Sequence, residues 1–202
     1  MIVDTHLLIS QIIYKSISKE INFKLNRLDF AYGNIKPDFN NNEIKCGHTL
    51  DESLYCVNKY SEELKEENIS NREFSRALGV INHFVCDYFC LYHRDGNEKK
   101  GVFEHLIYEL ILHIKLIALL LTGKIHLSSY ETFGNSVEAI VWNLQTKYNS
   151  EAESLSRDIT YALFVASQIS KLIICSSSLR FQQGETNISA EYRLGKVNGG
   201  NL

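Results

Sequence analysis

The chain has 202 residues, of which 45% are hydrophobic and 22% are charged, and its formal net charge is −3. This length suits one well-packed domain and is too short for two large ones. The charge, with no long basic run, disfavours broad electrostatic capture of nucleic acid as the main activity. A single proline among many Leu, Ile, Lys and Glu residues favours helices over a sandwich of short strands.

The N-terminal part predicts a helix followed by an irregular stretch. Residues 1–6 lack a basic start, an apolar run and a cleavage site, so no secretory signal is expected. Apolar residues at helical spacing predict the first of about six helices over residues 4–19. Residues 20–47 are rich in Asn and hold the only proline, Pro37, so we predict an irregular stretch of the kind that often carries function.

Two capping-box signatures mark the starts of the next two helices. Thr49 and Glu52 open a helix that is predicted to run to about residue 64. Ser70 and Glu73 open a helix that is predicted to run to about residue 92, before a polar loop over 94–97.

The most apolar element is a helix predicted over residues 103–122, which Gly123 should end. Its stretch from 106 to 121 contains Glu109, His113 and Lys115, which argues against a membrane span. No transmembrane segment is therefore expected in the chain.

The C-terminal part predicts two further helices, over residues 129–148 and 152–176, and then turns polar and glycine-rich. We expect an all-α protein with a single compact multi-helix domain over residues 1–180. Residues 181–202 are expected to form a flexible tail.

The five cysteines are odd in number and lack the spacing of a disulfide framework. This usage fits a reducing compartment, so the predicted localisation is cytoplasmic. Cys86 and Cys90 lie four apart on a predicted helix. Thiolate metal binding is conceivable there, but buried free thiols are the expectation.

Histidines and carboxylates recur at one-turn spacing on two predicted helices. His83 precedes Asp87 by four residues, and His105 precedes Glu109 by four. Side chains four apart project from the same face of a helix, so each pair can converge on one metal ion. Imidazole and carboxylate are ligands that zinc accepts. His93 follows closely enough to turn back towards the same site.

Each of these features alone has an ordinary structural explanation. A single His–carboxylate pair is usually a surface pair worth roughly a few tenths of a kcal/mol. His6 alone would be a core or surface histidine, Asp38 a turn residue after a proline, and His48 a solvated residue before a helix. Two pairs on neighbouring helices, with His93 between them, favour metal binding.

The order of these residues resembles the bacterial zinc-dependent phospholipase C family, the alpha-toxin-like enzymes. The resemblance covers roughly residues 4–175, and its specific part runs from His83 to Glu109. The motifs that carry it are Thr5-His6-Leu7, Tyr32-Gly33-Asn34-Ile35-Lys36-Pro37-Asp38, His48, Leu78-Gly79-Val80-Ile81-Asn82-His83-Phe84-Val85-Cys86-Asp87, Tyr92-His93 and His105-Leu106-Ile107-Tyr108-Glu109.

The resemblance implies the helical fold of zinc-dependent phospholipases C and single-strand nucleases, with two or three zinc ions. It implies that one ion is held by Asp38, His48, His83 and Asp87. It implies that a second is held by His93, His105 and Glu109. It implies that a third is held by His6 and a bridging Asp87, with an N-terminal residue completing the shell.

These metals imply the chemistry. A water between two zinc ions loses its proton near neutral pH, and the hydroxide attacks a phosphodiester while the ions neutralise charge on its oxygens. Asp38 is the candidate catalytic residue, since its second oxygen could accept a proton from the attacking water. Phe39, beside it, is a candidate substrate-binding residue, with simple packing as the alternative.

One departure from the family pattern concerns the third ion. Exported family members begin with a tryptophan whose amine and carbonyl bind this ion, whereas the only tryptophan here is Trp142. We therefore expect that the third ion uses the Met1 amine, uses Asp4, or is absent.

Four residues outside this set have weaker expectations. His113 lies one turn beyond Glu109 and is expected to be a partly buried non-ligand, and His126 is expected to be exposed. Asp158 and Tyr161 could orient a ligand histidine, but a core tyrosine beside a solvated carboxylate is the preferred interpretation.

The leading hypothesis is a zinc-dependent hydrolase that acts on a phospholipid or another small phosphoester. A nuclease or 3′-nucleotidase with the same cluster is the alternative enzyme, which the absence of a basic, aromatic-studded groove disfavours. A non-catalytic zinc-binding scaffold is the alternative from another class. Activity on bilayers would need an exposed apolar rim, and no segment of the sequence shows one clearly.

Overall fold

The computed structural model describes residues 1–179 except 22, 40–45, 66–68, 95–100 and 126–133. All regular elements among these residues are helical, which confirms the predicted all-α fold. In chain order they are α1 (Val3–Glu20), α2 (Arg27–Phe39), α3 (Leu50–Glu63), α4 (Asn71–Asp87), the short 3₁₀ helix η1 (Leu91–His93), α5 (Val102–Leu121), α6 (Val137–Ser150) and α7 (Leu155–Ser176). Residues 181–202, predicted as a tail, lie outside the described part of the chain.

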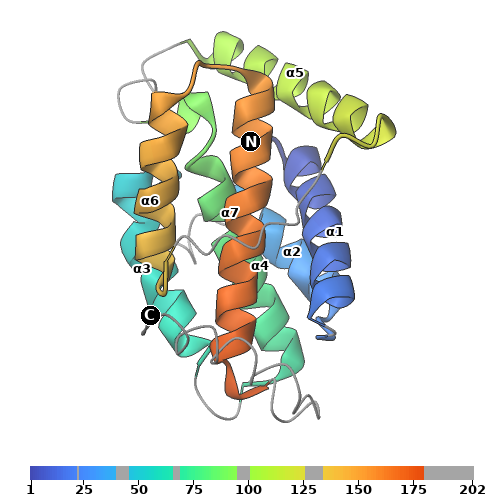
Figure 1. The fold of residues 1–202 in the computed structure, drawn as a ribbon, viewed down its shortest axis with the longest axis vertical. Helices are drawn as coiled ribbons and strands as arrows, with labels where there is room; N and C mark the ends of the chain where they lie inside the picture. Colours follow the sequence, from blue (N-terminus) through green and yellow to red (C-terminus); the bar gives the residue numbers. More distant parts are fainter. Residues whose placement is uncertain (22, 40–45, 66–68, 95–100, 126–133, 180–202) are drawn as a thin grey trace, which may run out of the picture.

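Helix α7 lies at the centre of the bundle, where it contacts α1, α4, α5 and α6. Figure 1 shows α6 and α7 upright, with α5 at the upper end of the bundle, running from near α7 towards the side of α1. By length and composition α7 is the one described helix that could cross a membrane, but 61% of its apolar window is buried within the fold. Burial of this extent is typical of the core helix of a globular protein.

Helices α2 and α4 pack against each other at a pair of glycines. A Cβ atom at Gly33 would lie 2.1 Å from the carbonyl oxygen of Arg76. A Cβ atom at Gly79 would lie 2.3 Å from the carbonyl oxygen of Phe30. Since no side chain fits at these distances, only glycine allows the two backbones to approach so closely. The contact brings the last turns of α2 to the face of α4 that carries His83.

We predicted an irregular stretch over residues 20–47. This prediction is wrong for residues 27–39, which form α2. Pro37 lies within the last turn of this helix, where it removes one backbone donor. Tertiary packing outweighs that cost, because α2 is held on α4 by the glycine contact and by an ion pair. The Asp29 carboxylate accepts from Arg72 at 2.8 Å and from Arg76 at 2.6 Å.

Local signals placed most other helix ends correctly. Both predicted capping boxes are present, at Thr49 and at Ser70. Gly123 follows α5 with a φ of 63°, the left-handed conformation that favours glycine. Helix α4, however, ends at Asp87 rather than near residue 92, and the chain then turns into η1.

The cysteines depart from the expectation in one respect. Cys46 and Cys56 form a disulfide that ties the segment before α3 to α3 itself. Cys86 and Cys90 are buried free thiols, as expected. Disulfides are rare in reducing compartments. The cytoplasmic localisation stays a prediction, and the disulfide is a feature that does not favour it.

Candidate metal centre

The eight predicted ligand residues come together from distant parts of the chain. Helices α1, α2, α4 and α5, the 3₁₀ helix η1 and the segment before α3 each supply at least one of them. They are His6, Asp38, His48, His83, Asp87, His93, His105 and Glu109.

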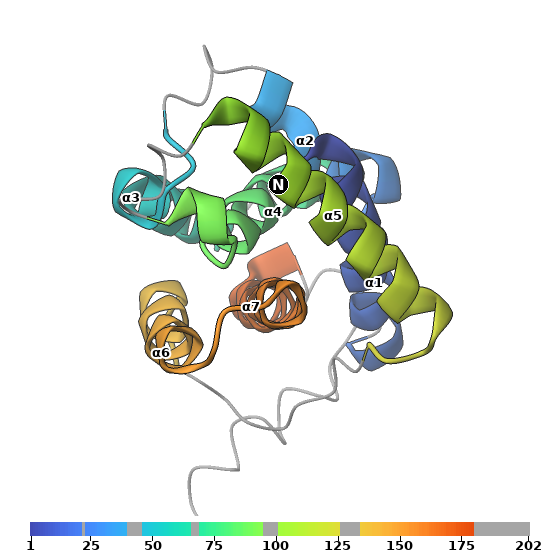
Figure 2. The ribbon, with the colours of Figure 1, turned by 90° about the horizontal axis from the view of Figure 1, so that it is seen from above.

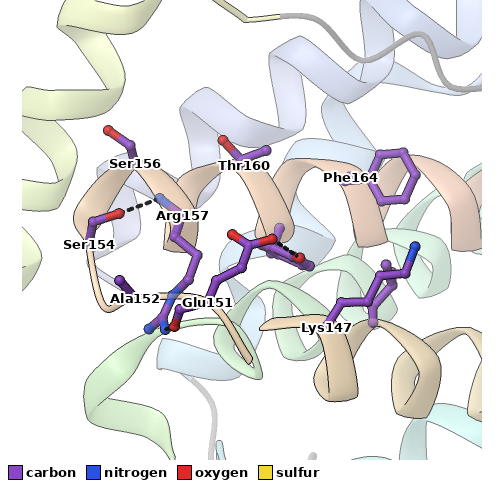
Figure 3. A pocket seen from close by; sticks show the side chains of 10 residues that line it. Lys147, Glu151, Ala152, Ser154, Ser156, Arg157, Thr160 and Phe164 are labelled. Carbon is purple, nitrogen blue, oxygen red and sulfur yellow. Dashed lines mark hydrogen bonds between the residues drawn. The ribbon is translucent and has the colours of Figure 1, made fainter. Parts of the chain in front are cut away.

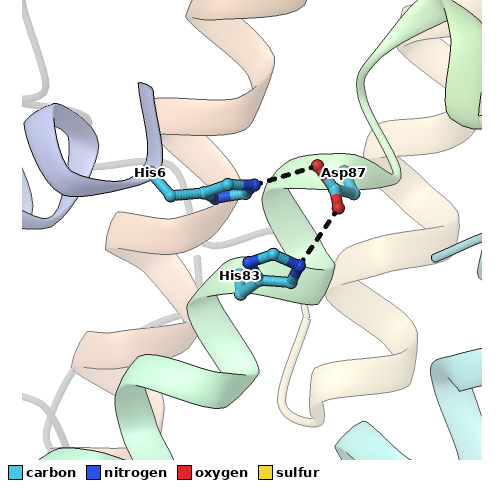
Figure 4. Close-up of side chains that lie close together, drawn as sticks. All are labelled: His6, His83 and Asp87. Atoms are coloured by element: carbon cyan, nitrogen blue, oxygen red, sulfur yellow. Dashed lines mark ion pairs between the residues drawn. The ribbon is translucent and has the colours of Figure 1, made fainter. Parts of the chain in front are cut away.

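Asp87, at the end of α4, lies at the middle of the cluster and is fully buried. Its Oδ1 accepts from the Met1 amine at 2.7 Å and lies 3.3 Å from His6 Nε2. Its Oδ2 lies 2.9 Å from His48 Nδ1 and 3.3 Å from His83 Nε2. Figure 4 shows His6 and His83 directed at the two oxygens of Asp87. One carboxylate thus faces donors from both sides, which is what a bridging ligand requires.

A second group of donors gathers around Glu109 on α5. Its Oε1 lies 3.0 Å from His93 Nε2 and 2.9 Å from His105 Nε2. The Met1 amine is 3.0 Å from the same oxygen, so it lies between this group and Asp87. Asp4, the other candidate for the N-terminal position, is exposed.

The ring of His83 is oriented by a backbone carbonyl. Its Nδ1 lies 2.9 Å from the carbonyl oxygen of Asn34, to which it donates. Its Nε2 is therefore the acceptor nitrogen, and it lies 3.1 Å from His48 Nδ1 and 3.7 Å from Asp38 Oδ1. A hydrogen bond of this kind commonly fixes the tautomer of a metal-binding histidine.

Several buried polar atoms of the cluster have no hydrogen-bond partner. Both ring nitrogens of His6 and the Oδ2 atom of Asp38 are in this state. Buried polar groups in folded proteins are almost always paired, so these atoms indicate a missing partner. Because the nearby atoms are imidazole nitrogens and carboxylate oxygens, a cation that accepts both, such as zinc, fits the site.

The spacing of the donors supports the same conclusion. Among the described residues, four groups of three place their donor atoms within 4.8 Å of one another, and three of these groups contain only the predicted ligands. The fourth group consists of Cys90, His93 and Glu109. Its cysteine is not one of the predicted ligands, because we expected Cys90 to be a buried free thiol.

Burial and neighbouring charges set the pKa values of the carboxylates and imidazoles of the cluster. Burial alone would raise the pKa of Asp87, but His93 and the Met1 ammonium hold it well below its usual range. Burial would likewise raise the pKa of Glu109, which the hydrogen bond to His93 and the Met1 charge lower to about 2. Burial lowers the pKa of His83 well below its usual value, so this imidazole is neutral and ready to bind a cation.

The remaining predicted residues lie near the centre or on the surface. Phe39 ends α2 and is 70% exposed, so it does not serve simple core packing. His113 is partly buried, as expected, and its Nδ1 lies 3.0 Å from the Oγ1 of Thr5, next to His6. His126 lies outside the described residues.

The preferred interpretation of Asp158 as a solvated carboxylate is wrong, because this side chain is buried. It accepts from Tyr148 Oη at 2.8 Å, from Tyr108 Oη and from the Leu91 amide at 3.2 Å. Leu91 begins η1, so Asp158 holds the backbone turn that returns His93 to the centre. Sequence spacing gave no sign of this role, because the contact joins residues far apart along the chain.

One cavity in the described part of the chain is separate from this centre. It has a volume of about 700 Å³ and lies between α6 and the start of α7, where Figure 3 shows Lys147, Glu151 and Arg157. Arg157 donates to the Tyr148 and Glu151 carbonyl oxygens and to Asp158. Since these bonds occupy the guanidinium, and none of the eight predicted ligands lines the cavity, it is not part of the metal centre.

Comparison with known proteins agrees with this geometry. A family model described as zinc dependent phospholipase C matches residues 5–161, which include all eight predicted ligands. No curated protein and no solved structure matches the chain significantly.

Proposed function

The chain belongs to the zinc-dependent phospholipase C family, and from this premise we propose that it hydrolyses a phospholipid or another small phosphoester. The observation that carries the proposal is the convergence of imidazoles on both oxygens of the buried Asp87. Buried nitrogen and oxygen atoms without partners, at His6 and Asp38, add to it.

We propose for this chain the three ligand sets that the family resemblance implies. Asp38, His48, His83 and Asp87 would hold one ion, and His93, His105 and Glu109 a second. His6, Asp87 and the Met1 amine would hold a third. Zinc bound there supplies Lewis acidity, which makes water acidic near neutral pH and neutralises charge on a phosphoryl group.

Asp38 is the residue that we assign to proton transfer. Burial raises its pKa, which makes the carboxylate a better proton acceptor. Its Oδ1 faces His83, whereas its Oδ2 has no hydrogen-bond partner and is free to hold the proton of an attacking water. The Asp38 side chain is one-fifth exposed, so it lies at the edge of the centre, although Oδ2 itself is buried.

The test is hydrolysis by the zinc-loaded protein of phosphatidylcholine, of bis(p-nitrophenyl) phosphate and of single-stranded DNA. We expect hydrolysis of the first two, and its loss with a zinc chelator. Asp38→Asn should lower the rate constant kcat by about 10²-fold or more. Asp51→Asn, an exposed carboxylate on α3, is the matched control and should retain activity.

The other outcomes separate the alternatives. Hydrolysis of DNA alone would replace the proposal with a nuclease. Bound zinc without hydrolysis of any substrate would replace it with a non-catalytic scaffold. Absence of bound zinc would remove the basis of all three.

A further inference from the structure

Helix α5 carries an apolar face that no other described element covers. Of the 14 large hydrophobic side chains that are exposed in the described part of the chain, nine lie on α5. Their exposed fractions range from 39% to 88%. Apolar patches that are this concentrated mark interaction sites on soluble proteins.

The exposed side chains form one continuous surface along the helix. The central row consists of Phe103, Leu106, Leu110, Ile114, Ile117 and Leu121. At about 100° per residue, the nine exposed apolar positions cover an arc of roughly 180°. The seam of a two-stranded coiled coil is narrower, since it uses two rows of residues. A broad face therefore fits a flat apolar layer better than a single partner helix.

The position of α5 suits contact with a flat surface. Figures 1 and 2 show the helix lying across one end of the bundle, outside α1, α4 and α7. Its inward side buries Glu109, Leu112 and Leu116. The outward side is therefore a ridge at the end of the molecule.

The exposed side of α5 is also nearly free of charge. Between Glu104 and Lys124 no charged side chain is exposed, and Lys115 is half-buried. A hydrocarbon layer offers no ionic partners and requires none, whereas a charged ligand or nucleic acid does. This distribution favours the apolar zone of a lipid surface.

The apolar face is continuous with the metal centre. His105 and Glu109 of the centre lie on the same helix, and Leu106 of the exposed row directly follows His105. The histidines at the edge of the centre are partly open to solvent, His105 by 34% and His48 by 28%. A surface docked on α5 would therefore lie beside the exposed edge of the cluster.

We propose that the α5 face docks on a phospholipid bilayer and so presents the metal centre to the headgroup layer. The proposal rests on the function proposed above, because it takes the substrate to be a membrane lipid. The α5 face would be the exposed apolar rim that activity on bilayers requires and that the sequence alone did not show.

The experiment is flotation of the zinc-loaded chain with phosphatidylcholine vesicles, which carry no net charge. Leu110→Glu with Ile114→Glu places two charges at exposed positions of the face. Leu28→Glu with Tyr55→Glu, at exposed apolar positions of α2 and α3, is the matched control. We expect the α5 variant to lose binding by about tenfold or more and the control to bind as the unchanged chain.

Further measurements separate docking from catalysis. The α5 variant should keep its zinc content, its thermal unfolding and its hydrolysis of soluble bis(p-nitrophenyl) phosphate. Vesicle binding without hydrolysis of any substrate would leave docking intact and overturn the function. Hydrolysis of the soluble ester without vesicle binding would overturn docking alone. Light scattering that shows a dimer, dissociated by the α5 substitutions and unable to bind vesicles, would assign the face to a second copy.

Discussion

At the scale of single residues, ion pairs between a buried ammonium group and two carboxylates organise the centre. Asp87 and Glu109 are held as carboxylates by the groups around them, and the Met1 amine contacts both. Burial alone would lower the pKa of that amine, but Asp87 and its neighbours raise it to about 12. At neutral pH the amine is therefore protonated in the metal-free protein and occupies space among the ligands.

This arrangement predicts that zinc binding releases protons. A metal ion bound by the Met1 amine must displace its proton, so affinity should rise with pH, by roughly tenfold per pH unit for each proton released. Calorimetric titration with zinc in buffers of different ionisation enthalpy measures the number of protons released per zinc ion bound. Acetylation of the amine should reduce that number. A binding constant that does not change between about pH 6 and pH 8 would contradict the prediction.

At the scale of elements, the approach of α2 to α4 decides whether the centre can form. The glycine contact sets the distance at which the Asn34 carbonyl meets His83 and at which Asp38 faces the same ring. A local signal for this contact is absent, because it depends on two glycines that are far apart in sequence.

Gly79→Ala should separate the two helices, since its Cβ would lie 2.3 Å from the Phe30 carbonyl oxygen. The expected cost is about 1–3 kcal/mol in the free energy of unfolding, together with weaker zinc binding. Denaturant unfolding and metal analysis measure the two effects. Gly101→Ala, whose Cβ would meet no atom within 4 Å, is the control. Equal stability of the two variants would show that the contact is not tight.

The disulfide acts on the segment that precedes α3. Cys46 lies two residues before His48, and its bond to Cys56 anchors this segment on the helix. Replacing both cysteines with serine should lower stability by roughly 2–3 kcal/mol for a loop of this length. The double substitution should also weaken binding of the ion that His48 is proposed to hold. Thermal unfolding with and without reductant tests this, and an unchanged melting temperature Tm in reductant would contradict it.

At the scale of the whole molecule, the proposed ligands join elements that are far apart along the chain, from α1 to α5. An ion held by His6, Asp87 and the Met1 amine would connect α1 with α4, and one held by His93 and Glu109 would connect η1 with α5. The centre would then act as a cross-link between helices that otherwise meet through apolar packing.

Removal of zinc should therefore destabilise the whole fold and not only the site. A ligand at 1,000 times its dissociation constant stabilises by about 4 kcal/mol, so chelation should lower Tm by several degrees. Scanning calorimetry with and without chelator measures the shift. Glu109→Gln should reduce the shift, whereas Glu104→Gln, on the exposed side of α5, should leave it unchanged.

Local sequence patterns predicted the elements whose signals are local. The capping boxes at Thr49 and Ser70 and the glycine after α5 depend on hydrogen bonds and backbone angles within a few residues. Helix α2 escaped prediction because its stability comes from packing on α4. The buried position and hydrogen bonds of Asp158 were not predicted either, because its partners Tyr108 and Leu91 are distant along the chain.

The sequence alone determined which side chains are candidates for the centre, because one-turn spacing places His83 with Asp87 and His105 with Glu109 on common helix faces. Tertiary structure decided where these side chains lie and which of their atoms face one another. It assigned Nε2 of His83 to the centre by giving Nδ1 to a carbonyl of another helix. It also decided which side of the apolar helix α5 is covered. The physical reason is that burial and hydrogen-bond partners are properties of the packed molecule, not of any segment by itself.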